Sequence, residues 1–268
     1  MKMPPSASVS VSNTFYMPIA NSIYYLVYQT GEKLPVVLLH SAGGSLLSWP
    51  AEIRRLAGYR IYALDLPGHG KSGGQGYQSI SSYADVVMEW LDAVGLSRAV
   101  FVGHSMGSAI VQMLALDHPG HVLGLVLIGS AASLPVNPML INESANQTTF
   151  NKAVEKVVSW SFSPQTPQNI KTLVAKRLAE ARPSVLHGDF LACDTFNVTN
   201  RIHEIHQPTL VICGSQDKMT PVRNAYFLAD NLPAARVEII PGAGHMVMLE
   251  RSQEVAASLA QFFRQIPY

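Results

Sequence analysis

The sequence Gly103-His104-Ser105-Met106-Gly107 is the stretch that decides the fold. It follows the apolar, β-branched run Ala99–Val102 and precedes the amphipathic segment Ala109–Ala115. This order predicts a strand, a tight turn and a helix, with Ser105 at the apex in a strained backbone conformation. The flanking glycines let the helix pack closely on the strand, because a side chain at either position would collide. A hydroxyl exposed at such a turn can attack a carbonyl if a base and an oxyanion stabiliser lie nearby.

The composition limits the classes of protein to consider. The chain has 268 residues, enough for one large α/β domain with an insertion. Its net charge is +1 and it has no long basic run, which argues against a nucleic-acid partner. Two cysteines, Cys193 and Cys213, are too few for a disulfide scaffold. No window approaches the roughly 18 apolar residues of a membrane span, and Met1–Asn13 lacks the apolar stretch of an export signal. We therefore expect a cytoplasmic protein without a membrane span.

Short apolar runs alternate with helical patterns along the chain. This alternation predicts a parallel sheet covered by helices on both faces, whose sites form at the carboxyl ends of the strands. Strands are expected at 23–28, 36–40, 60–65, 99–102, 122–128, 209–213 and 236–240. Helices are expected at about 46–57, 79–94, 106–117, 221–231 and 251–265.

One connection is much longer than the others. About 80 residues separate two late strands, whereas ordinary connections are a handful of residues long. Helical patterns occupy this stretch near 143–160 and 167–181. We predict that residues 134–205 form a mostly helical cap over the site, and that residues 1–133 and 206–268 form the core.

Two further segments carry the residues that a nucleophilic serine requires. His245 lies in the Gly-rich stretch Pro241–Met246, directly after the last expected strand. Asp217 lies in Gly214–Lys218, directly after the preceding strand. Its carboxylate can accept the second imidazole N–H, fix the tautomer and stabilise the imidazolium that forms during attack. The order serine, aspartate, histidine is that of a nucleophile-elbow architecture.

The oxyanion hole is expected to combine two backbone N–H groups. One is the amide of Met106, the residue after the nucleophile. The other should come from the Gly-rich loop His40–Gly44, whose backbone can approach a ligand closely. We predict that Ala42 N–H is this second donor. Loss of one such donor typically costs about 10²–10³ in turnover.

Four motifs together resemble the α/β-hydrolase-fold serine hydrolases, in particular small carboxylesterases and lipases with a helical cap. The resemblance covers residues 22–266, and the motifs are Gly103–Gly107, Asp65–Ser72, Gly214–Asp217 and Gly242–His245. It implies a mostly parallel sheet flanked by helices, with the cap inserted between two late strands. One departure is the pair His40-Ser41, where the family usually has His-Gly.

The leading hypothesis is a serine carboxylesterase that needs no cofactor. It would hydrolyse short- to medium-chain carboxylic esters, small-molecule substrates, through an acyl-enzyme intermediate. The expected cap is rich in Val, Leu and Phe, which indicates an apolar acyl chain. The same scaffold hosts C–C bond hydrolases, lactonases, amidases and peptidases, so these are alternatives, and a non-catalytic small-molecule receptor is another. The sequence does not decide the oligomeric state.

Each member of the triad also has a structural interpretation. A buried turn serine, a structural loop histidine and a helix N-cap are the alternatives for Ser105, His245 and Asp217. Asp65 is a rival triad acid, but its turn motif favours hydrogen bonds to loop amides.

Four residues are candidates for the substrate pocket: Ser41, His104, Trp49 and Met246. Trp49 either lines the acyl pocket or anchors the first helix. A metal site is not expected, because the histidines and carboxylates of the cap region match no zinc signature. These residues, for which we expect packing or solvated roles, are His187, Asp189, Asp194, His203 and His206.

Overall fold

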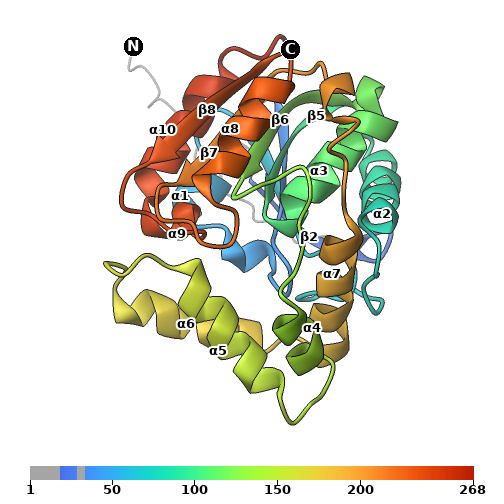
Figure 1. The fold of residues 1–268 in the computed structure, drawn as a ribbon. Helices are drawn as coiled ribbons and strands as arrows, with labels where there is room; N and C mark the ends of the chain where they lie inside the picture. The colour runs from blue at the N-terminus through green and yellow to red at the C-terminus, as the bar shows by residue number, and fades with distance from the viewer. Residues whose placement is uncertain (1–18, 29–33) are drawn as a thin grey trace, which may run out of the picture.

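An eight-stranded sheet runs through residues 19–28 and 34–268, the part of the chain that the computed structural model describes (Figure 1). The strand order is β1-β2-β4-β3-β5-β6-β7-β8. From β4 to β8 neighbouring strands are parallel, whereas β1 and β2 are joined antiparallel at one edge. The strands are β1 Ile19–Ala20, β2 Ile23–Tyr28, β3 Pro35–Leu39, β4 Arg60–Leu64, β5 Ala99–His104, β6 Val122–Ile128, β7 Thr209–Gly214 and β8 Ala235–Ile240. The α/β-hydrolase fold predicted from the motifs is confirmed.

The central strands are continuous apolar runs because both of their faces are buried. Successive side chains of a strand point to opposite faces. In β3, Val37 and Leu39 pack into one hydrophobic core, and Val36 and Leu38 pack into the core on the other face. The sheet therefore lies between two layers of helices.

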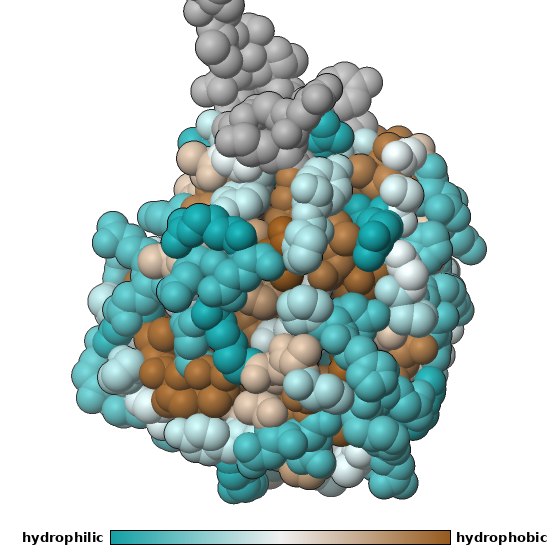
Figure 2. Space-filling view, turned by 90° about the horizontal axis from the view of Figure 1, so that it is seen from above, coloured by the Kyte–Doolittle hydropathy of each residue, from teal (hydrophilic) through white to brown (hydrophobic). Residues whose placement is uncertain are grey.

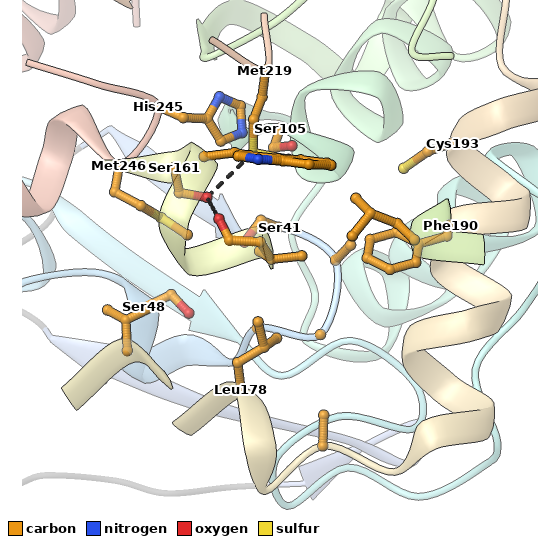
Figure 3. Close-up of a pocket in the computed structure, with 18 of the residues that line it drawn as sticks. Ser41, Ser48, Ser105, Ser161, Leu178, Phe190, Cys193, Met219, His245 and Met246 are labelled. Carbon is orange, nitrogen blue, oxygen red and sulfur yellow. Dashed lines mark hydrogen bonds between the residues drawn. The ribbon is translucent and has the colours of Figure 1, made fainter. Parts of the chain in front are cut away.

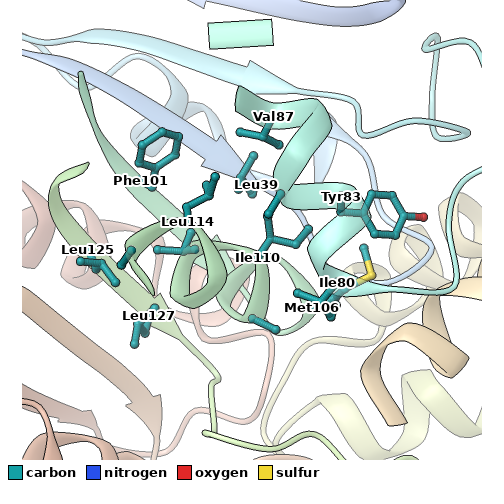
Figure 4. Packing of buried hydrophobic residues seen from close by; sticks show 14 of the residues in the cluster. Leu39, Ile80, Tyr83, Val87, Phe101, Met106, Ile110, Leu114, Leu125 and Leu127 are labelled. Atoms are coloured by element: carbon teal, nitrogen blue, oxygen red, sulfur yellow. The ribbon is translucent and has the colours of Figure 1, made fainter. Parts of the chain in front are cut away.

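Helices from different parts of the chain cover the two faces. The first core receives side chains of α2, α3 and α8, and Figure 4 shows α2 and α3 packed against the strands through Ile80, Val87 and Ile110. The second core receives side chains of α1 and α10. These helices are α1 Ala51–Arg54, α2 Ile80–Ala93, α3 Met106–Asp117, α8 Val222–Asn231 and α10 Ser252–Phe263.

Two expected helices are interrupted in the structure. The one expected at 46–57 consists of a 3-10 turn at Leu46–Ser48 and the short α1, since Pro50 stands between them as the N-cap of α1. The one expected at 143–160 is divided into α4 (Pro138–Ser144) and α5 (Phe150–Ser161). Asn146 makes the break, because its side chain accepts a hydrogen bond from the Thr148 amide and favours a turn.

Four helices occupy the connection between β6 and β7. Besides α4 and α5 they are α6 (Gln168–Ala179) and α7 (Pro183–Thr195), and the sequence patterns did not predict α7. Figure 1 shows α4, α5 and α6 beyond one end of the sheet. All four fall within the predicted cap, residues 134–205; the division into cap and core domains stays a prediction.

The opposite end of the molecule is seen in Figure 2, where hydrophilic side chains cover most of the face and hydrophobic ones form separate groups. Among the described residues, no helix combines the length and the apolar character needed to cross a membrane. The N-terminal stretch expected to lack an export signal, Met1–Asn13, lies outside the described residues. A cytoplasmic location stays a prediction.

Candidate active site

Ser105 lies at the turn between β5 and α3, as the sequence predicts. Its φ is 53° and its ψ is −115°, a conformation that costs energy for any residue with a side chain. A Cβ at Gly103 would collide with the backbone of Gly107, and one at Gly107 would lie 2.7 Å from the His40 carbonyl oxygen. The strain at Ser105 is thus imposed by a helix packed directly on the strands.

A buried network fixes the first turn of α3. Ser108 Oγ lies 2.6 Å from the carbonyl oxygen of Ser105 and 2.7 Å from Ser130 Oγ. Gln112 Nε2 donates to the Ala131 carbonyl at 3.1 Å and also reaches Ser130. The sequence analysis missed this network, although polar residues on an otherwise apolar helix are a signal for it.

His245 and Asp217 come together as predicted. His245 Nδ1 lies 2.8 Å from Asp217 Oδ2, and both side chains are buried. A carboxylate only accepts, so Nδ1 carries the proton and Nε2 is left as an acceptor. Asp217 also accepts from Met219 N and Thr220 N, each at 2.8 Å, and from Thr220 Oγ1 at 2.8 Å.

The surroundings of Asp217 keep it ionised. Burial by itself raises the pKa of this carboxyl, but His245 and the hydrogen bonds from Thr220 outweigh burial and hold the pKa below its usual value. The helix-cap alternative is wrong, because Pro221 is the N-cap of α8. Thr220 was not predicted, although a hydroxyl three residues after an aspartate is typical of such turns.

The loop that carries His245 is held from two sides. His104 Nε2 donates to the His245 carbonyl at 3.0 Å, and the two rings lie 4.9 Å apart. Burial and the nearby His245 lower the pKa of His104 to about 3, so this ring is neutral. On the other side Glu250, which follows in α9 (Val247–Glu250), accepts from Gly244 N at 2.8 Å and from Ser163 N at 3.0 Å.

Ser105 and His245 line one cavity of about 1080 Å³. Figure 3 shows them on the same side of it, with Met219 beside them and Phe190 and Cys193 across the cavity. The walls include Leu140, Val157, Leu178 and Phe190 of the inserted helices. The cavity therefore lies between the strand ends and the insertion.

Most amides of the loop after β3 donate to acceptors within the described residues, but that of Ala42 does not. The amides of Gly43, Gly44, Ser45, Leu46 and Leu47 all donate to oxygen atoms within the protein. Ala42 N–H has no partner in the described part of the chain, and Ala42 lines the cavity beside Ser105. Met106 N–H belongs to the first turn of α3, whose amides have no acceptor inside the helix. These are the two predicted oxyanion donors.

The predicted pocket residues divide into two pairs. Ser41 and Met246 line the cavity, whereas His104 and Trp49 do not. The expectation for His104 is wrong, because its ring is buried beneath the His245 loop and donates to the His245 carbonyl. The pocket alternative for Trp49 is also wrong: this side chain is fully buried in the second core, where it anchors the first helix.

The remaining carboxylates and histidines have other contacts. Asp65 accepts from Leu46 N at 2.7 Å and Lys71 N at 2.9 Å, which is the loop-bonding role expected for it. His187 contacts Ser144 and the Ile141 carbonyl, and Asp194 accepts from Val136 N. Within the described ranges, no three His, Cys, Asp or Glu side chains gather as a metal site would require.

Comparison with known proteins identifies the family. Residues 35–252 match the family model described as the alpha/beta hydrolase fold, so the chain belongs to this family. A solved structure of a thermophilic esterase has a TM-score of 0.80 and 30% sequence identity, covering 94% of this chain and 98% of that one.

Three curated relatives show the range of reactions in the family. The chain is 27% identical over 244 residues to a pimeloyl-[acyl-carrier protein] methyl ester esterase of Edwardsiella ictaluri (86% of this chain, 93% of the relative). It is 29% identical over 267 residues to a 2-hydroxy-6-oxononadienedioate/2-hydroxy-6-oxononatrienedioate hydrolase of Burkholderia vietnamiensis (91% of each). It is also 29% identical over 241 residues to the dihydrolipoyllysine-residue acetyltransferase component of the acetoin cleaving system of Pseudomonas putida. That match covers 86% of this chain but only 64% of the relative's length.

Proposed function

We propose that this protein is a serine carboxylesterase in which Ser105 is the nucleophile, His245 the base and Asp217 the orienting acid. One observation carries the proposal: a serine held at φ 53° opens onto the same cavity as a histidine whose Nδ1 is bound by a buried carboxylate. The esterases among the relatives and solved structures support the same reaction class.

The proposed reaction uses the serine, the imidazole and the two amides in the following order. His245 Nε2 takes the hydroxyl proton as Ser105 Oγ bonds to the ester carbonyl carbon, and the carbonyl π pair moves to oxygen. Ala42 and Met106 amides donate to that oxyanion. The intermediate collapses, the bond to the alcohol oxygen breaks, and His245 returns the proton to the leaving alcohol. Water, activated by the same nitrogen, then hydrolyses the acyl-enzyme to the free acid. Asp217 stays ionised throughout.

The cavity walls support an apolar acyl group of short to medium length. Leu140, Val157, Leu178 and Phe190 all come from the insertion, and each buries an apolar side chain at the cavity. Apolar walls with a few placed polar groups are typical of sites for small molecules.

The test is Ser105→Ala, assayed with p-nitrophenyl esters of increasing chain length and with a fluorophosphonate probe. The variant should fold as the wild type, lose turnover by up to about 10⁶-fold and take no label. Full retained activity would refute the assignment. Tight binding of an ester by the wild-type protein without turnover would instead favour a receptor.

A second candidate is a hydrolase of a carboxylate-bearing substrate, with cleavage of a C–C bond. Five Lys and Arg side chains line the cavity against one carboxylate, that of Glu180; they are Lys176, Arg177, Arg182, Lys218 and Arg223. None of the five is in an ion pair within the described ranges, so their charge is available to a ligand. The relative named for a dienedioate, a dianion, has this kind of substrate.

Substrate comparison separates the two candidates. The carboxylesterase predicts that p-nitrophenyl butyrate or hexanoate is hydrolysed faster than a 2-hydroxy-6-oxo-dienedioate. The reverse order would favour the C–C hydrolase. Matched neutral and ω-carboxylate esters measure the effect of the cationic side chains separately from the type of bond cleaved.

A further inference from the structure

Asp189 is a buried carboxylate that the proposed reaction does not use. It lies in α7 of the insertion and is 0% exposed. Oδ2 accepts from Gly43 N at 2.7 Å and from His69 Nε2 at 2.8 Å. Oδ1 accepts from Tyr83 Oη at 2.6 Å. One side chain of the insertion thus joins three separate parts of the core.

The hydrogen-bond acceptors around His69 indicate that His69 and Asp189 form an ion pair. His69 Nε2 faces a carboxylate and His69 Nδ1 lies 3.0 Å from the Pro67 carbonyl oxygen, so both nitrogens face acceptors and both must donate. Burial lowers the pKa of His69, but Asp189 and the Pro67 carbonyl outweigh burial and the pKa lies above its usual value. The imidazolium neutralises Asp189, so the carboxylate adds no net negative charge beside the oxyanion site.

His40, whose ring centroid lies 4.7 Å from that of His69 with the planes tilted by 59°, is neutral. Its Nδ1 donates to the Ser41 carbonyl at 2.8 Å, and its Nε2 accepts from Leu66 N at 3.0 Å. Burial and the charge of His69 lower its pKa well below the usual value. The loop His40–Gly44, here called the oxyanion loop, is therefore fixed at its start by the neutral His40 and at Gly43 by Asp189.

The bond to Gly43 controls the conformation of the turn that carries Ala42. Gly44 N donates to the Ser41 carbonyl at 2.9 Å, which closes a β-turn with Ala42 and Gly43 at its centre. Gly43 has φ +62° and Ala42 is not a positive-φ residue, the pattern of a type II turn. The Gly43 N–H belongs to the central peptide of this turn, which reverses direction in the alternative type I turn.

The insertion also packs on the same glycine. A Cβ at Gly43 would lie 2.6 Å from Leu178 Cδ1 and 2.8 Å from Leu186 Cδ1. Both leucines belong to the insertion. Because Asp189 occupies the Gly43 amide, Ala42 is the one of the two central turn residues whose amide is free within the part of the chain described.

We propose that Asp189 is a positioning residue: through Gly43 it holds the oxyanion loop in the type II turn that presents Ala42 N–H to the substrate. The insertion thereby completes the oxyanion hole as well as covering it. This inference rests on the proposed function, because it assigns a role in stabilising the oxyanion.

The experiment compares Asp189→Ala, Asp189→Asn and Tyr83→Phe with wild type. Asp189→Ala should lower kcat by about 10- to 100-fold with KM within about twofold, less than the loss of a donor itself. The Ki of a trifluoromethyl ketone, whose adduct with Ser105 places an oxyanion in the hole, should rise by the same factor. Asp189→Asn keeps an acceptor for Gly43 and should restore kcat to within about fivefold. Tyr83→Phe removes the bond to Oδ1, together with the bond that Tyr77 N donates to Tyr83 Oη at 3.0 Å, but keeps the bond from Gly43 N to Oδ2, so kcat and Ki should stay unchanged.

Hydrogen exchange supplies a readout that needs no substrate. In Asp189→Ala the amides of peptides covering 41–46 should exchange faster than in wild type, while those of α3 should not change. If Asp189→Ala keeps wild-type kcat and Ki, or if its KM rises while the affinity for the ketone is kept, the inference fails and the esterase assignment stands. If wild type hydrolyses no ester, the assignment fails, and hydrogen exchange alone decides whether Asp189 holds the loop. Unchanged exchange would overturn that as well.

Discussion

The strand ends and the insertion hold the site by different means. At the strand ends the backbone itself is constrained, since Gly103 and Gly107 have no room for a side chain and Ser105 is strained as a result. The insertion acts through single side chains, such as Asp189 at the Gly43 amide and Arg182 at two loop carbonyls. Backbone constraints produce glycine motifs that can be recognised in the sequence. Side-chain contacts between distant segments produce almost no recognisable motif. The placing of Ser105, Asp217 and His245 is consequently easier to predict than the contacts around them.

The largest effect is expected from Asp217→Asn, at a strand end. The amide can still accept from the backbone at Met219 and Thr220, but its NH₂ group then faces His245 Nδ1 and favours the wrong tautomer. Turnover should fall by about 10⁴-fold without a comparable loss of stability. Steady-state kinetics and urea unfolding measure the two quantities.

Asp65→Asn is the matched control, because Asp65 is the rival carboxylate and also accepts backbone amides. It should lose stability, yet its kcat should remain within about tenfold of wild type, since Asp65 contacts neither Ser105 nor His245. Equal losses of turnover in the two variants would contradict the role of Asp217.

Gly107→Ala tests the backbone constraint directly. The new methyl group would collide with the Leu39 carbonyl and lie 2.7 Å from the His40 carbonyl oxygen, and the Leu39 carbonyl, at the end of a central strand, cannot rotate away. The free energy of unfolding should fall by about 3 kcal/mol, measured by urea denaturation. Gly120→Ala is the control, because a Cβ there meets nothing within 4 Å and should leave stability nearly unchanged.

The two regions should respond to pH with opposite signs. The pKa of Asp217 is lowered in the folded protein, so its contribution to stability is present above about pH 3.9 and is lost as the pH falls through the folded value. The pKa of His69 is raised, so its contribution is full below about pH 6.5 and is lost as the pH rises through the folded value. Unfolding curves from pH 3 to 9 should show both losses.

Asp189→Asn tests whether the loss of stability at alkaline pH comes from the pair of His69 and Asp189. The titratable groups that face His69 are Asp189, Asp65, Tyr83 and the neutral His40. Of these, only Asp189 accepts a hydrogen bond from the ring, whose other acceptor is the uncharged Pro67 carbonyl. Without this carboxylate the decline above about pH 6.5 should disappear, while the acid limb stays as in wild type. A decline that persists in the variant would show that another group causes it.

The smallest effect is expected from Arg182→Ala, in the insertion. Its exposed guanidinium donates to the carbonyls of Gly68 at 3.0 Å and Gly74 at 2.6 Å, and exposed contacts contribute little. Stability should change by no more than about 0.5 kcal/mol. The KM of an ω-carboxylate ester should rise a few-fold while that of the matched neutral ester stays constant, and equal changes for both esters would argue against an effect of charge.

The sequence predicts the sheet, and the placing of Ser105, Asp217 and His245 at strand ends, for a common physical reason. Strands buried on both faces read as continuous apolar runs, and each chemical motif follows such a run directly. Close packing and tight turns at strand ends also require glycine, so Gly103 and Gly242 mark these places in the sequence. The order of strands then brings Ser105, Asp217 and His245 to one edge without any knowledge of side-chain contacts.

The parts that sequence patterns missed depend on contacts across the fold. Asp189 is 146 residues from Gly43, and no local spacing signals their hydrogen bond. Helix α7 was overlooked because it is apolar on nearly all sides, as expected for a helix buried between core and insertion. Trp49 could be assigned only once the packing of the second core was known.

The two chain segments that lead into and out of the insertion pair with each other. Ser133 and Asn197 form an antiparallel bridge, and Val198 N donates to the Ala132 carbonyl at 2.8 Å. Because the insertion leaves and rejoins the core at neighbouring points, we expect that another segment of different length could replace it without moving the strands. We expect that a replacement segment would also have to supply an oxygen atom that accepts from the Gly43 amide. Without this acceptor, the turn at Ala42 and Gly43 would lose its support.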